Sequence, residues 1–114
     1  MPRRSAAAAA SLERQAPVFS ALGDSTRLRL VARLAGSEPQ SITHLTEGTG
    51  ITRQGVTKHL RVLSDAGIVR PARKGRETLW HLERESLEAA RRSLERISAL
   101  WDETLDRLKK YVEE

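Results

Sequence analysis

Residues 41–67 read SITHLTEGTGITRQGVTKHLRVLSDAG, and this stretch decides the fold. It predicts two short helices joined by a glycine-containing turn. Ser41 and Thr52 are good N-cap residues, because their side-chain oxygens can accept a free amide of the first helical turn. We therefore expect one helix over residues 42–47 and a second over residues 53–65.

The second of these helices has two different faces. Val56, Leu60 and Leu63 recur at i, i+4 and i+7 and define one buried face. The opposite face carries hydrogen-bonding groups suited to base edges and phosphates. Such a helix can be held rigidly on one side while it enters the major groove of DNA on the other. The polar residues are Arg53, Gln54, Thr57, Lys58 and Arg61.

A change of hydrophobic period follows Gly67, which is placed to end the second helix. Residues 68–73 and 77–82 are strand candidates on either side of Lys74-Gly75-Arg76. A helix-turn-helix followed by a hairpin with a basic tip describes a winged helix-turn-helix. The fold class is therefore mainly α with a small β-hairpin wing.

The flanking segments also have helical spacing. Asp24 or Ser25 can cap a helix that precedes the motif, and Pro17 bends or breaks the segment over residues 12–22. Residues 85–112 predict one uninterrupted helix of about 40 Å.

The apolar stripe of that last helix is too long for one small domain to cover. We expect a second copy of the chain to cover it, which gives a homodimer. Packing against the first helix within one chain is the alternative, and both arrangements can coexist. The expected interface residues are Leu12, Phe19, Leu87, Leu94, Ile97, Trp101, Leu105 and Leu108.

The positive charge is concentrated in one part of the chain. The net charge is +5, yet residues 51–76 alone hold seven Lys and Arg against Asp65, a local excess of six. Such a block indicates a surface for a polyanion, with a merely solvated face as the alternative.

Composition excludes several classes of site. There is no cysteine, which excludes disulfides and thiolate metal sites and agrees with a cytoplasmic protein. No apolar run approaches the ~20 residues that cross a bilayer, so we expect no membrane partner. Neither a nucleophile–histidine–carboxylate arrangement nor a phosphate-binding glycine loop is evident, so we expect no enzyme.

The length of 114 residues suits one domain. Residues 1–11 are basic and then alanine-rich, without the apolar core of a secretory signal, and we expect a disordered tail there. Residues 12–84 are expected to form the DNA-binding domain, and residues 85–114 its C-terminal dimerisation helix.

Two stretches resemble ArsR-type bacterial repressors. They are residues 18–30, VFSALGDSTRLRL, and residues 50–70, GITRQGVTKHLRVLSDAGIVR, within a resemblance that runs over about residues 17–82. The resemblance implies a homodimer, built through the first and last helices, whose recognition helices and wings bind a near-palindromic operator in double-stranded DNA. It implies helix contacts from Thr52, Arg53, Gln54, Thr57, Lys58 and His59, and wing contacts from Arg73, Lys74 and Arg76.

The chain departs from the metal-sensing members of that family. Residues 42–45 contain no thiol where many members carry paired cysteines, and the last helix has no histidine. Asp102 and Asp106 lie one turn apart, but a carboxylate pair on an exposed helix is usually solvated. We expect no metal and no cofactor, and the sequence does not identify a small-molecule effector.

We therefore interpret the chain as a sequence-specific DNA-binding regulator, a repressor that does not respond to metal. The alternative is a winged-helix protein-interaction module that has lost specific DNA binding. The retained basic residues of the helix and wing argue against that alternative.

Overall fold

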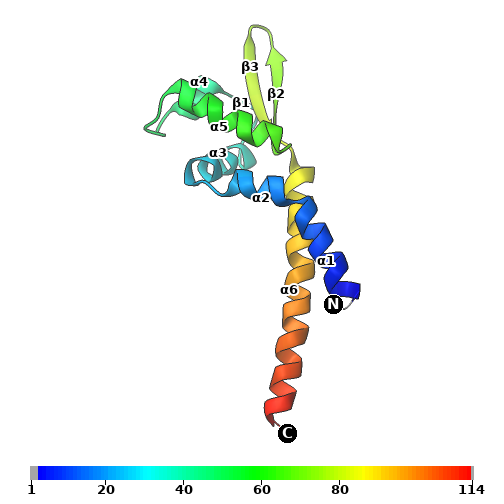
Figure 1. Ribbon diagram of the computed structural model, residues 1–114. Helices are drawn as coiled ribbons and strands as arrows, with labels where there is room; N and C mark the ends of the chain where they lie inside the picture. Colours follow the sequence, from blue (N-terminus) through cyan, green and yellow to red (C-terminus); the bar gives the residue numbers. More distant parts are fainter. Residues whose placement is uncertain (1–2, 114) are drawn as a thin grey trace.

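The computed structural model describes residues 3–113. A helical head carries the β-hairpin wing, and the long helix α6 extends from it with α1 alongside (Figure 1). In chain order the elements are α1 (Arg3–Arg14), α2 (Ala16–Leu22), α3 (Ser25–Ala35), β1 (Gln40–Ser41), α4 (Ile42–Thr46), α5 (Arg53–Asp65), β2 (Val69–Lys74), β3 (Glu77–Leu82) and α6 (Arg84–Glu113).

The protomer is elongated. Its extents are 67 × 25 × 21 Å, and its radius of gyration is 18.7 Å. A compact chain of this length would have a radius of about 13 Å. The protruding part of α6 therefore lies far from the core of the head.

The head is built around one apolar core. Leu30 of α3, Leu45 of α4 and Leu60 of α5 are each 0% exposed, so the core joins all three helices. Val56 and Leu63 are equally buried, which confirms the predicted inner face of α5.

The predicted N-caps are confirmed. Asp24 accepts the amide of Arg27 at 3.0 Å and begins α3. Ser41 accepts the amide of residue 44 at 3.2 Å, and Thr52 accepts that of Gly55 at 3.0 Å. These caps fix where the helix-turn-helix motif begins and where its second helix starts.

The wing belongs to a three-stranded antiparallel sheet of order β1-β3-β2. Lys74 pairs with Glu77, so the turn contains two residues, and Gly75 takes φ +65° at its first position. This pattern suits a II′ hairpin turn, in which glycine is favoured at that position. The strand β1 was not predicted, because two residues carry no readable period.

The disordered tail predicted over residues 1–11 is wrong for residues 3–11, which belong to α1; residues 1–2 lie outside the described part of the chain. Alanine has the highest helix propensity, and α6 offers this helix a packing face. Ala8 is only 3% exposed, and the hydroxyls of Ser11 and Ser93 form a buried hydrogen bond of 2.8 Å. Since α6 is remote in sequence, local composition could not reveal that face.

The helix α6 is confirmed and is longer than predicted, at 30 residues. Its first turns pack on the head, where Ala90 is buried and Leu87 lies against the core. Further along, its apolar side chains are largely exposed. Within residues 3–113 no helix combines the length and apolar character needed to cross a bilayer.

Candidate nucleic-acid interface

The outer face of α5 is polar and open to solvent. Arg53, Gln54, Lys58 and Arg61 are exposed, and Thr57 is partly buried. With residue 42 of α4 these side chains line an open hollow of about 440 Å³. The structure therefore gathers the predicted helix residues on one surface, opposite the face that packs into the core.

The N-terminus of α5 adds hydrogen-bond donors to this surface. The Thr52 side-chain oxygen accepts the amide of Gly55, which leaves the first-turn amides of Arg53 and Gln54 without a helical acceptor. Free amides and the positive end of the helix dipole both favour an anion. The start of α5 is thus suited to a phosphate.

Gly55 is explained by packing at this cap. A Cβ at Gly55 would lie 3.3 Å from the Thr52 hydroxyl oxygen and 3.6 Å from Cδ1 of Ile51. The near neighbours belong to the chain itself, so glycine makes room for the cap despite its low helix propensity.

The wing carries further cations. Arg73, Lys74 and Arg76 are exposed, and Arg76 lines one hollow together with Arg53 and residue 78, so the wing and the start of α5 share a surface. Within residues 3–113, six exposed cations of α5 and the wing have no carboxylate oxygen within 4 Å, whereas Arg70 of β2 lies 3.5 Å from a carboxylate oxygen of Glu83. These six residues, the cationic surface, are Arg53, Lys58, Arg61, Arg73, Lys74 and Arg76.

His59 has a different environment from the other predicted DNA-binding residues. Its Nδ1 lies 3.3 Å from a guanidinium nitrogen of Arg27 and 3.9 Å from a carboxylate oxygen of Asp24. The Arg27 backbone amide lowers the pKa of Asp24 from its ordinary value. The nearby positive charge of Arg27 lowers it further, whereas desolvation opposes these effects. The Asp24 cap could be read from sequence, but its link to residue 59 could not.

The predicted dimer-interface residues fall into two groups. Leu87 and Phe19 pack against the head core, while Leu12 and Ile97 are partly buried. The remaining four are 43–58% exposed: Leu94, Trp101, Leu105 and Leu108.

The exposed group lies to one side of α1. Ser93 and Leu100 face α1. Leu94 is the residue after Ser93, and Trp101 is the residue after Leu100. One residue is about 100° around a helix, so α1 does not cover Leu94 or Trp101.

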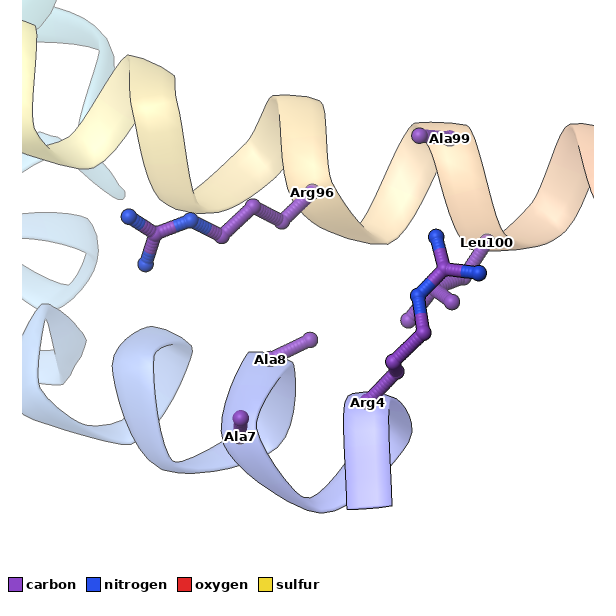
Figure 2. Close-up of a pocket in the computed structure, with 6 residues that line it drawn as sticks. All are labelled: Arg4, Ala7, Ala8, Arg96, Ala99 and Leu100. Atoms are coloured by element: carbon purple, nitrogen blue, oxygen red, sulfur yellow. The ribbon is translucent and has the colours of Figure 1, made fainter. Parts of the chain in front are cut away.

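A hollow of about 300 Å³ lies between α1 and α6 (Figure 2). Arg4 reaches from α1 alongside Leu100, and Arg96 extends along the groove between the helices. Arg4 pairs with Glu103 at 3.0 Å, while Arg96 donates to the Ser11 hydroxyl at 2.8 Å. These contacts hold α1 on α6 and bring no nucleophile and base together.

Comparison with known proteins agrees with this geometry. A family model described as a helix-turn-helix domain matches residues 22–72. The HTH-type transcriptional regulator YuzN of Bacillus subtilis, itself described as uncharacterized, is 38% identical over 77 residues, which cover 62% of this chain and 84% of YuzN. An ArsR-like transcriptional regulator from Rhodococcus sp. RHA1 is 35% identical with a TM-score of 0.75, covering 90% of this chain and 92% of that one.

The chain belongs to the ArsR family of helix-turn-helix transcriptional regulators. The predicted family and the winged helix-turn-helix fold are thereby confirmed. A further solved structure, the transcriptional repressor BigR from Xylella fastidiosa, is 26% identical with a TM-score of 0.63 and covers 82% of this chain and 90% of its own. These relatives are transcriptional regulators rather than enzymes.

This ArsR-family chain brings few potential metal ligands together. Within residues 3–113, no three His, Cys, Asp or Glu side chains are close enough to hold one metal ion. His81, near the end of the wing strand β3, instead contacts Glu83 at 3.0 Å. Asp102 and Asp106 are exposed on α6.

Proposed function

We propose that this ArsR-family protein binds double-stranded DNA in a sequence-specific manner as a homodimer and represses transcription by occupying a near-palindromic operator. The observation that carries the proposal is the cationic surface, whose six side chains are exposed and unpaired among residues 3–113. Phosphates that bind such a surface release condensed counterions, which favours association.

The helix and wing have different roles in this proposal. Arg53 and Gln54 lie at the start of α5, where an arginine can read guanine and a glutamine can read adenine in the major groove. The later helix residues and the wing residues hold phosphates and set the register on the duplex. The proposed contacts are Thr52, Arg53, Gln54, Thr57, Lys58, Arg61, Arg73, Lys74 and Arg76.

The exposed apolar face of α6 supports the homodimer. Trp101 is 58% exposed and Leu108 is 54% exposed on a helix that extends beyond the head (Figure 1). A second copy would cover such a face through a self-complementary interface. We propose that residues 85–114 form the dimerisation helix, joined by α1, whereas the DNA-binding elements lie within residues 12–84. Two-fold symmetry then requires two related half-sites.

Repression without metal sensing is the remaining part of the proposal. BigR, a related structure, is described as a transcriptional repressor. The chain has no cysteine to supply thiolate ligands. We propose that the protein needs no cofactor and that a bound dimer blocks access of polymerase to the promoter.

Selection from a random-sequence duplex library tests the proposal. DNA that binds the purified chain is amplified over repeated rounds, and the molecular mass of the complex with the enriched duplex is then measured. We expect an enriched near-palindrome bound by two chains. Enrichment of a site bound by one chain would contradict the dimer. Absence of any enriched sequence would contradict specific DNA binding and favour the protein-interaction module.

A further inference from the structure

His59 connects the recognition helix α5 to the preceding part of the head. It lies three residues after Val56 and four before Leu63, on the flank of the buried face rather than on the polar outer face. There its Nδ1 lies 3.3 Å from a guanidinium nitrogen of Arg27 on α3. Within residues 3–113, no other side-chain hydrogen bond joins α5 to a different element.

Arg27 is itself firmly held. Its Nε donates to the backbone carbonyl of Ala21 at 2.5 Å, and its backbone amide donates to the Asp24 cap at 3.0 Å. The guanidinium is thus anchored at the α2–α3 junction before it reaches α5. A contact from such an anchor constrains the position of α5 more closely than a contact from a free surface side chain.

The donor chemistry settles which form of His59 makes the contact. A guanidinium has donors and no acceptor, so His59 Nδ1 must accept. The hydrogen bond therefore requires the tautomer that carries its proton on Nε2. The Asp24 oxygen, at 3.9 Å from Nδ1, is beyond hydrogen-bond distance.

We propose that His59 is a positioning residue that fixes the orientation of the recognition helix, and thereby the sequence selectivity, without contacting DNA. This inference rests on the proposed DNA-binding function. The apolar contacts of Val56, Leu60 and Leu63 are non-directional, so small rotations of α5 about its axis cost little free energy. The Arg27–His59 hydrogen bond supplies the direction that those contacts lack. Base readout depends on this orientation more strongly than phosphate binding does.

Two matched variants separate the acceptor from the ring. In His59→Asn, the amide oxygen takes the place of Nδ1 and can still accept from Arg27. In His59→Phe, an aromatic ring remains but the acceptor is lost. His59→Leu provides a smaller acceptor-free variant if the phenyl ring does not fit. Thermal unfolding checks that each variant is folded.

The variants are titrated with the duplex enriched by the wild-type protein and with a random duplex of equal length, at several salt concentrations. We expect His59→Phe to weaken binding to the enriched duplex about five- to tenfold, which is the effect of one lost hydrogen bond. Affinity for the random duplex and its salt slope should stay unchanged. We expect His59→Asn to remain within about twofold of wild type on both duplexes.

Three results would overturn the inference. Wild-type selectivity in the folded acceptor-free variants would show that the hydrogen bond does not position α5. A loss of random-duplex affinity with a shallower salt slope, in His59→Asn as well, would show that His59 contacts a phosphate. Equal loss of selectivity in the Asn and Phe variants would show that a hydrogen-bond acceptor at position 59 does not determine the orientation of α5. Failure of the wild-type protein to prefer any duplex would instead overturn the proposed function, and this inference with it.

Discussion

Replacement of Trp101 by alanine should dissociate the dimer without unfolding the protomer. The side chain is 58% exposed in the protomer and lies on the face of α6 that α1 does not cover. A fully enclosed tryptophan buries about 200 Å². About 115 Å² therefore remains for a partner, which corresponds to about 3 kcal/mol at 25 cal/mol per Å².

Two-fold symmetry doubles the effect, because each copy contributes one Trp101 to the interface. With complete enclosure, the loss of about 6 kcal/mol would raise the dimer dissociation constant by about four orders of magnitude. The protomer should lose little stability, since more than half of the side-chain surface is already exposed to solvent in the protomer.

Sedimentation equilibrium over a wide concentration range measures the dissociation constant directly. Leu28→Ala is the matched control, because Leu28 is 51% exposed but lies on α3 in the head. We expect monomers for the Trp101 variant and unchanged dimers for the control. An unchanged dissociation constant for the Trp101 variant would refute the assignment of the interface, and equal loss in both variants would refute the location on α6.

Three further predictions concern DNA contacts, acid stability and the α1–α6 contact. Lys74→Ala should weaken binding to all duplexes alike and reduce the slope of log affinity against log salt by about one. Arg53→Ala should instead relax base preference by about 1–3 kcal/mol. Equal behaviour of the two variants in anisotropy titrations would contradict their separate roles. The pKa of Asp24 is lowered in the folded state, so its ionised carboxylate stabilises the fold above its ordinary pKa of 3.8. This stabilisation is lost as the pH falls through the lower pKa of the folded state. Between pH 5 and pH 2, the unfolding midpoint should therefore fall less steeply for Asp24→Asn than for the wild-type protein. Ser11→Ala should cost about 1–3 kcal/mol in chemical denaturation, because the buried Ser93 hydroxyl then keeps only the Ser11 carbonyl at 3.4 Å and Arg96 loses its hydroxyl acceptor. The Ser11→Ala/Ser93→Ala double variant should cost less than the sum of the two single variants; strictly additive costs would argue against the hydrogen bond between the hydroxyls.

The helix-turn-helix and wing could be read from sequence because their signals are local. Ser41 and Thr52 have cap chemistry at the predicted positions, and both accept the expected amides. The spacing of Val56, Leu60 and Leu63 fixes the buried face of α5, and through it the outer polar face. Each of these signals depends on residues within about two helical turns of one another.

The features that sequence reasoning missed depend on distant partners. The helix α1 forms on a face of α6 that begins about 80 residues later, and Ser93 meets Ser11 there. The strand β1 forms because Gln40 pairs with Trp80 of β3, and a strand of two residues is too short to be predicted from its sequence pattern. The family resemblance implied that His59 contacts DNA, and no local pattern indicated its contact with α3. Its link to Arg27 crosses 32 positions of sequence.

The ratio of affinities for the enriched duplex and a random duplex of equal length tests the central claim most directly. It should be measured by anisotropy with the wild-type chain, at about 0.05 M and 0.2 M salt. We expect the enriched duplex to bind at least about a thousandfold more tightly than the random duplex, with both affinities falling steeply between the two salt concentrations. Equal affinity for the two duplexes at both salt concentrations would contradict a sequence-specific regulator built on the cationic surface of α5 and the wing.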